Sequence, residues 1–457
     1  MKDSLFSALL CISLMYSCNT GESGVHSRIK SAVNNIRIVN THEHFNTEAD
    51  RLISDVDFFT LVSGYLQADL VSSGMSNEEL AFMMDTKNPD KERWDLFNKY
   101  RNNVKTTGYS ICFNKTVEGL FGVSEINENT FRVINEQMAA SNLKEGWFKH
   151  VLSDKSGIDV TVVDPLGKNA QDVSVYPADF FVTVRRFDNF VRVNKNNVAA
   201  IENQYGKSVN SLSDYLNALD KAFEKAVNED RIVAIKSGLA YSRKLYYEDV
   251  PEDKAEVLFS AFINSSRVLN SIEQKMLDDF MMHQVIGRAE KYDLPIQIHT
   301  GILSRNFNNS NPIENTNAIH LSNLFLKYRK AKFIIFHGSY PYMAELSYLA
   351  KHFPNVYIDM CWMYIISPLA SKNYLEEWLL TVPSNKIMGF GGDTSVEWAL
   401  GHSVMAREII TDVLVKMVEE GNCTEPDAIK IAERILRENA IEIFKLKKTG
   451  NNWGRAL

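Results

Sequence analysis

The sequence contains no long apolar run and no concentrated block of basic residues. No uninterrupted apolar stretch reaches the ~18 residues that a membrane-spanning helix needs. The 50 basic residues are outnumbered by 57 acidic ones and form no cluster, so nucleic-acid binding is not expected. Internal repeats and low-complexity tracts are also missing. With 45% hydrophobic and 23% charged residues, the 457-residue chain has the composition of a folded globular protein.

Cysteine is scarce as well, with five residues in the whole chain. Two of them, Cys11 and Cys18, fall in the N-terminal segment discussed next. The other three, Cys112, Cys361 and Cys423, are far apart and odd in number, so neither a disulfide framework nor a C-x-x-C metal site is predicted. We interpret these three as buried thiols.

The N-terminus resembles a bacterial lipoprotein signal. Lys2 precedes an apolar core at 5–16, which is too short to span a bilayer, and the segment ends in Ser17-Cys18. Residues 1–17 are therefore predicted to be a signal peptide, Cys18 the lipid-attachment site and 18–30 a tether. The expected location is the bacterial cell envelope, where the membrane is contacted only through the lipid. An ordinary secretory signal, or an N-terminal helix of a cytoplasmic protein, is the alternative.

Short β-branched or aromatic runs recur along the rest of the chain, each followed by a helical pattern. Most are almost wholly apolar, as is typical of strands buried on both faces. Eight such runs predict an α/β fold, a (β/α)8 TIM-type barrel, over residues 31–446. Residues 46–157 are too long for a loop and predict a mostly helical insertion after the first strand; 447–457 would be a C-terminal tail. The runs are Ile36–Asn40, Val160–Val163, Phe180–Val184, Ile232–Ile235, Ile296–Ile298, Phe333–Phe336, Val356–Ile358 and Ile387–Phe390.

Polar residues at the ends of five of these strands point to a metal site. Residues at the carboxyl ends of barrel strands share one face, and alternate residues of a strand point the same way, so His42 and His44 should converge. His299 and His337 would add nitrogen donors, and Asp393 an oxygen, a donor set that suits zinc. A sixth residue, Lys236, ends the fourth strand.

The ordered set of strand-end residues resembles the amidohydrolase superfamily of metal-dependent hydrolases. The resemblance covers the chain from about Ile36 to Leu446. Within the superfamily the sequence most resembles the family 2 branch, and in particular the amidohydrolase-like domain of nodulin/glutamine synthetase fusions. The supporting stretches are Leu294-Pro-Ile-Gln-Ile-His-Thr-Gly301, His337-Gly-Ser-Tyr-Pro-Tyr342, Phe353-Pro-Asn-Val-Tyr-Ile-Asp359 and Ile435-Leu-Arg-Glu-Asn-Ala440.

This resemblance implies roles for the strand-end residues. His42, His44 and Asp393 would bind a divalent ion, expected to be zinc, and His299 would bind it or bridge to a second ion. His337 would ligate a second ion or polarise the substrate. Asp393 would also move a proton between water and the leaving group. One ion per chain is expected. If Lys236 is carbamylated it would bridge two; if not, it would bind a substrate carboxylate.

The predicted function is hydrolysis of an amide, ester or lactone in a small carboxylate-bearing substrate. Arg185 and Arg243 are further candidates for binding the carboxylate, and Glu397 for orienting a metal-binding imidazole. The alternative is an isomerase or decarboxylase on the same barrel, since uronate isomerases also carry a long insertion after the first strand. A non-catalytic lipid-anchored binding protein is a third interpretation. No macromolecular partner is expected, and a homo-oligomer is left open.

Overall fold

The computed structural model describes residues 24–143, 145–170, 172–264, 268–304 and 311–456. The predicted signal peptide and its lipid-attachment residue Cys18 lie outside the described residues. No helix in the described part of the chain is long and apolar enough to cross a membrane.

Eight parallel strands follow one another around the barrel in chain order, which confirms the predicted fold class. Their side chains are almost all buried, as the apolar runs predicted. Backbone hydrogen bonds from Thr41 to Phe390 (3.1 Å) and from Asp393 to His42 (3.0 Å) join the last strand to the first. The strands are β1 Ile38–Glu43, β2 Ile158–Val163, β3 Phe181–Arg186, β4 Ala234–Ser237, β5 Ile296–Ile298, β6 Phe333–Ile335, β7 Val356–Asp359 and β8 Ile387–Met388.

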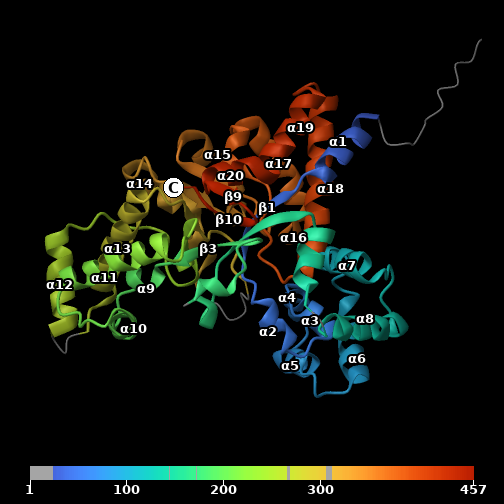
Figure 1. The fold of residues 1–457 in the computed structure, drawn as a ribbon, viewed down its shortest axis with the longest axis horizontal. Helices are drawn as coiled ribbons and strands as arrows, with labels where there is room; N and C mark the ends of the chain where they lie inside the picture. The colour runs from blue at the N-terminus through green and yellow to red at the C-terminus, as the bar shows by residue number, and fades with distance from the viewer. Residues whose placement is uncertain (1–23, 144, 171, 265–267, 305–310, 457) are drawn as a thin grey trace, which may run out of the picture.

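The segment between β1 and β2 forms the predicted helical insertion, on one side of the barrel (Figure 1). Side-chain caps begin several of its helices; Thr47, Ser76 and Asn127 each close a capping box. Its core is aromatic, and five rings lie within 6.0 Å of the Phe58 ring. The helices are α2 Glu48–Leu52, α3 Phe58–Val62, α4 Leu66–Ser72, α5 Asn77–Met84, α6 Asp90–Arg101, α7 Gly108–Phe121, α8 Glu128–Ser141 and a π-helix at Lys149–Lys155.

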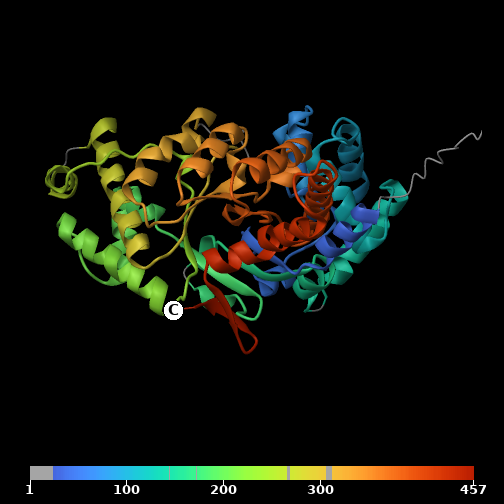
Figure 2. The ribbon, with the colours of Figure 1, turned by 90° about the horizontal axis from the view of Figure 1, so that it is seen from above.

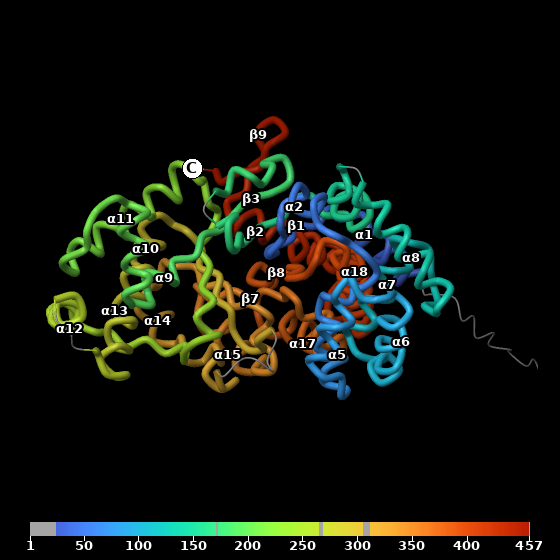
Figure 3. Tube along the Cα trace, turned by 90° about the horizontal axis from the view of Figure 1, so that it is seen from below, coloured from blue at the N-terminus to red at the C-terminus, as the bar shows by residue number. Residues whose placement is uncertain are grey.

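The remaining helices surround the barrel, and α9 to α14 lie on the side away from the insertion, as Figures 1 and 3 both show. Helix α1 begins inside the range predicted to be a tether. The helices are α1 Gly24–Asn35, α9 Asp188–Val191, α10 Lys195–Tyr205, α11 Leu212–Asn228, α12 Glu252–Asn264, α13 Ser271–Lys291, α14 Ser322–Lys327, α15 Met343–His352, α16 Met363–Ile366, α17 Pro368–Thr381, α18 Trp398–Glu419, α19 Glu425–Glu433 and α20 Asn439–Ile443.

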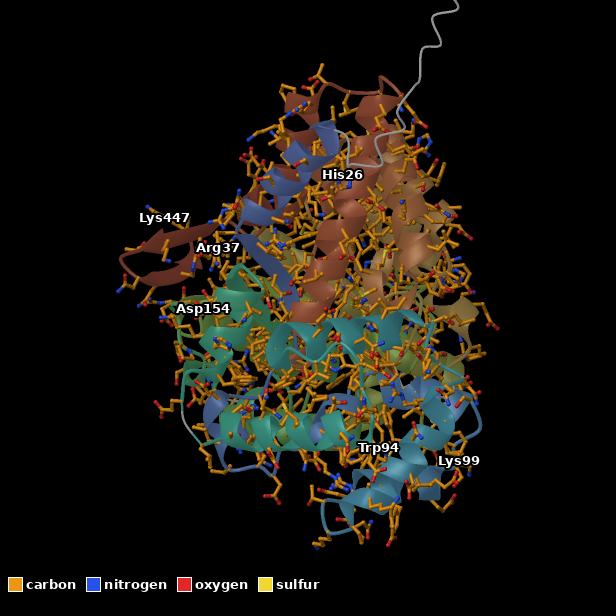
Figure 4. The ribbon with its side chains drawn as sticks, turned by 90° about the vertical axis from the view of Figure 1, so that its right-hand side faces the viewer. His26, Arg37, Trp94, Lys99, Asp154 and Lys447 are labelled. Carbon is orange, nitrogen blue, oxygen red and sulfur yellow. The ribbon has the colours of Figure 1, made fainter. Side chains whose placement is uncertain are left out.

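The segment predicted to be a C-terminal tail forms an antiparallel hairpin. Strand β9, Leu446–Thr449, pairs with β10, Asn452–Arg455. The hairpin projects from the body (Figure 2), and Lys447 marks it in Figure 4, far from Trp94 and Lys99 of α6. A hydrogen bond from the Trp453 amide to Ala178 (2.6 Å) and one from the Arg455 guanidinium to Asp293 (2.7 Å) attach it to the barrel.

Candidate metal centre at the strand ends

The first cluster joins the end of β1 to the segment that follows β8. The Nε2 atoms of His42 and His44 lie 3.2 Å apart, and each lies 3.7 Å from Oδ1 of Asp393. Two nitrogens bound to one tetrahedral zinc at its usual bond length lie about 3.3 Å apart. The three side chains therefore fit a single divalent ion.

The surroundings prepare His44 to act as a ligand. Its Nδ1 donates to the backbone carbonyl of Asp164 (2.9 Å), which leaves the lone pair on Nε2, the atom that faces His42. The carboxylate of Asp164 is held in turn by Arg186, at 2.7 and 2.9 Å. Burial lowers the pKa of His42 well below its ordinary value, and the nearby Lys236 lowers it further, so His42 is a neutral donor at pH 7.

A second cluster joins β5 to β6 and uses the other oxygen of Asp393. Nδ1 of His299 lies 3.0 Å from Nε2 of His337, and Oδ2 of Asp393 lies 3.8 Å from the same His337 atom. Each ring donates its other nitrogen to a backbone carbonyl, His299 to Ile302 (2.8 Å) and His337 to Cys361 (3.1 Å). Burial lowers the pKa of His337 to about 4 and that of His299 well below its usual range. The lone pairs of two neutral imidazoles, on Nδ1 of His299 and Nε2 of His337, thus face each other across 3.0 Å. A bound cation would stabilise this arrangement.

Lys236 lies beside the first cluster and is almost fully buried. Its Nζ is 3.5 Å from Nε2 of His42 and 3.5 Å from the centre of the Phe336 ring. Burial lowers the pKa of Lys236 to about 8, although the charge of Asp164 opposes that shift. The amine of Lys236 therefore lies directly beside the first His–Asp cluster.

Asp393 adopts a left-handed backbone conformation, with φ at +51°, and contacts on both sides hold it there. The buried Glu43 accepts from the Thr394 amide through Oε2 and from Nδ2 of Asn40 through Oε1, each at 2.8 Å. Oδ1 of Asn40 accepts from the Gly392 amide at 2.9 Å. Burial raises the pKa of Glu43 well above its usual range, and these two hydrogen bonds counteract the rise.

A tyrosine from the insertion completes the support of Asp393. The hydroxyl of Tyr65, just before α4, donates to the Asp393 carbonyl oxygen at 2.6 Å. The Tyr65 ring stacks on Trp362 at 4.4 Å and on Tyr109 at 5.2 Å, and Trp362 lies against His337 at 5.3 Å. The sequence predicted the helical insertion but did not single out Tyr65, Asn40 or Glu43, because their partners are distant in the chain.

The two arginines predicted to bind substrate are not brought to the clusters. Arg185 forms an ion pair with Asp230 and donates to the carbonyl of Ala170 at 2.9 Å. Arg243 pairs with Asp279 and covers the Tyr247 ring. The neighbouring Arg186 occupies the position that Arg185 was expected to fill, because adjacent residues of a strand point to opposite faces.

Glu397 does not contact a metal-binding imidazole. Its Oε1 accepts from Arg51 at 3.0 Å and from the Trp147 indole at 2.8 Å, both in the insertion. Glu397 therefore fastens the insertion to the segment that follows Asp393, in place of the orienting role we expected from the sequence.

A parallel barrel that carries histidines and an aspartate at its strand ends is the architecture of metal-binding barrel proteins, and this chain has that architecture. The amidohydrolase family model matches residues 218–446, half of the chain, and the protein belongs to the amidohydrolase family. This confirms the resemblance inferred from the strand-end motifs.

Curated relatives match only parts of their own length. The protein is 27% identical to Protein fluG of Emericella nidulans over 234 residues, which cover 49% of this chain and 27% of that protein. It is 23% identical to the uronate isomerase of Thermotoga maritima over 266 residues, 53% of this chain and 55% of the enzyme. The chain thus spans about a quarter and about half of the length of these two relatives.

Solved structures match nearly the whole fold. The T. maritima uronate isomerase superimposes with a TM-score of 0.75 at 20% identity, over 92% of this chain and 97% of that one. The glucuronate isomerase of Caulobacter crescentus gives 0.75 at 17% identity, over 94% and 95%. At identities of 20% and 17% the similarity is one of fold, and it includes both the barrel and the helical insertion.

Proposed function

We propose that the protein is a zinc-dependent hydrolase of an amide, ester or lactone in a small carboxylate-bearing molecule. The observation that carries the proposal is the position of Asp393, whose two oxygens face two separate imidazole pairs. A divalent ion bound there supplies a lowered pKa for water and a polarised substrate carbonyl.

We assign proton transfer to Asp393 and binding of the substrate carboxylate to Lys236. Asp393, with its side chain only 10% exposed, takes a proton from water and returns it to the leaving group. Its backbone is held on both sides, so the carboxylate does not need to reorganise during the transfer. Lys236 and Arg186 are the cations near the His42 and His44 pair, and we assign the substrate carboxylate to Lys236 because Arg186 is already engaged by Asp164.

Isomerisation of a uronate is the second candidate, and two observations favour it. Uronate isomerases share the fold over nearly the whole chain, including the insertion, and one of them also matches in sequence. Such a reaction moves a proton between neighbouring carbons and needs no water as a reactant. Asp393 could serve as its base.

The test is a substrate panel with the purified, zinc-loaded full-length protein. N-acyl amino acids, lactones and uronates are incubated separately in water enriched in ¹⁸O, and the products are identified by mass spectrometry and NMR. The proposal predicts cleavage that places one solvent oxygen in the product carboxylate. Conversion of a uronate to its keto isomer, with no hydrolysis anywhere in the panel, would reverse the ranking of the two functions.

A further inference from the structure

The end of β7 carries a buried carboxyl group that the proposed mechanism does not use. Asp359 is fully buried and lies two residues before Cys361, whose carbonyl accepts from His337. We propose that Asp359 is a positioning residue of the metal centre. It acts on His337 through the turn that follows β7, and on β1 through Thr41. The inference rests on the metal-dependent function proposed above and adds to it a residue outside the ligand set.

Only one oxygen of this carboxyl group takes part in hydrogen bonds within the described chain. Oδ1 of Asp359 accepts from the Cys361 amide at 2.9 Å and from the Thr41 hydroxyl at 3.1 Å, whereas Oδ2 is buried without a partner. Burial raises the pKa of Asp359 to about 7, and the bonds from Thr41 and Cys361 oppose the rise. Burying a carboxyl group with one oxygen unpaired is unfavourable, so the two contacts of Oδ1 are the feature of this residue that requires an explanation.

The first contact of Oδ1 leads to His337. The amide of Cys361 is held by Asp359, and the Cys361 carbonyl accepts from Nδ1 of His337 at 3.1 Å. A carbonyl can only accept, so Nδ1 carries the ring proton and Nε2 keeps the lone pair. Nε2 is the atom that faces the metal centre, 3.8 Å from Oδ2 of Asp393. Fixing Cys361 therefore fixes both the tautomer and the direction of the His337 ring.

The same contact also holds a strained turn. Trp362 has a left-handed backbone, with φ at +66°, a conformation that an aromatic residue rarely adopts. A hydrogen bond fixes the turn on each side of this strain. The Cys361 amide donates to Asp359, and the next amide, that of Trp362, donates to the Gly391 carbonyl at 2.9 Å. In this conformation the Trp362 ring lies 5.3 Å from the His337 ring. Without the bond to Asp359 the turn can relax, and the ring that packs against His337 moves with it.

The second contact of Oδ1 leads to β1. The Thr41 hydroxyl lies between Oδ1 of Asp359, at 3.1 Å, and the Phe390 carbonyl, at 3.0 Å. Thr41 directly precedes His42, so its hydroxyl joins β1 to the end of β7 and to the segment after β8. One carboxyl oxygen thus contacts the residue before His42 and the residue that bonds to His337, which belong to different histidine clusters.

Two variants of Asp359 and one control test this role. Asp359→Asn keeps an oxygen at the Oδ1 position and should retain nearly the wild-type zinc affinity. Asp359→Leu leaves the Cys361 amide unpaired, so the Kd of zinc should rise about 10- to 100-fold, as after loss of other groups that support metal ligands. The control is Asn355→Leu, at the opposite end of β7, where the Asn355 side chain donates to the carbonyls of Phe325 (3.1 Å) and Tyr328 (2.9 Å). It should lower the unfolding temperature and leave zinc affinity unchanged.

A second readout needs neither metal nor substrate. In the metal-free, full-length protein labelled with ¹⁵N at histidine, hydrogen exchange of the His337 Nδ1 proton is followed by NMR, and His337→Gln assigns the signal. The bond to Cys361 protects this proton. Its exchange should therefore be slow in the wild type and in Asp359→Asn, and at least about 10-fold faster in Asp359→Leu.

The proposal is overturned if Asp359→Leu keeps the wild-type zinc affinity, if Asp359→Asn is as weak as Asp359→Leu, or if Asn355→Leu weakens zinc binding as much. Free exchange of the His337 Nδ1 proton in the wild type would also overturn it, and that result does not depend on whether an Asp359 variant folds. Neither zinc affinity nor exchange depends on a substrate, so failure of the proposed hydrolysis would leave both results interpretable. Absence of zinc binding in the wild type would reject the proposed function, and the exchange measurement would still decide the role of Asp359.

Discussion

The hydrogen bond between Asn40 and Glu43 can be reversed in polarity, which gives a direct test of how Asp393 is positioned. In the wild type, Oδ1 of Asn40 accepts from Gly392, so its Nδ2 must donate to Glu43, and both Glu43 oxygens are acceptors. The double variant Asn40→Asp/Glu43→Gln exchanges donor and acceptor within the pair. It keeps the net charge and preserves an acceptor for each of the two backbone amides.

The single variants break this pattern. In Glu43→Gln two amide NH2 groups face each other across the former 2.8 Å bond; in Asn40→Asp two carboxylates do. Each leaves a buried polar group without its partner, at a cost of about 1–3 kcal/mol. If losing the hydrogen bond lets Asp393 leave its metal-binding conformation, zinc affinity should drop by about 10- to 100-fold. This is the usual effect of losing a residue that supports a metal ligand.

The assay is zinc affinity by competition with a chromophoric chelator, together with turnover and thermal unfolding for all four proteins. We expect each single variant to lose zinc affinity and turnover, and the double variant to recover most of both. A double variant as weak as the sum of its singles, or singles with unchanged zinc affinity, would refute the positioning role. Equal unfolding temperatures with restored affinity only in the double variant would separate positioning from global stability.

Four further predictions address other parts of the chain. Asp393→Asn should keep the fold but reduce turnover by about 10² or more, as loss of a general acid–base does; near-normal turnover would place the chemistry elsewhere. Lys236→Ala should keep its metal content with and without bicarbonate and mainly raise KM, whereas bicarbonate-dependent loss of an ion would indicate a carbamate. His402 is buried, and burial lowers its pKa to about 3, so below about pH 6.5 the unfolded chain binds a proton that the folded chain cannot. Between pH 6.5 and 5 the free energy of unfolding should therefore fall by about 2 kcal/mol. Denaturant titrations should show that His402→Gln abolishes this fall. Cys18→Ala should release the protein from the membrane fraction or block its processing, and wild-type protein that is free of the membrane and keeps residues 1–17 would contradict lipidation.

The strands were predictable from the sequence because most barrel strands, buried on both faces, are almost wholly apolar runs. The 296–298 run matches β5 residue for residue, and the others agree to within a few residues at their ends. The metal-binding candidates His42, His44 and Asp393 could also be predicted, since polar residues that follow apolar runs share one end of a parallel barrel. No pairing between distant residues had to be known.

The support around the site was not predictable in this way. Asn40 and Glu43 looked like ordinary strand residues, and their partners 392 and 394 lie about 350 positions away. Arg185 was chosen over Arg186 because a strand pattern does not fix which face an end residue takes, and a shift of one residue reverses the answer.

We infer that the strand-end histidines and Asp393 bind the divalent ion on which activity depends. The measurement that tests it most directly is the metal content of the purified protein by mass spectrometry, before and after chelation, with turnover recorded on the same samples. We expect at least one tightly bound divalent ion per chain, loss of turnover on its removal, recovery on adding zinc, and little metal in His42→Asn/His44→Asn. Full turnover in a metal-free protein would contradict it.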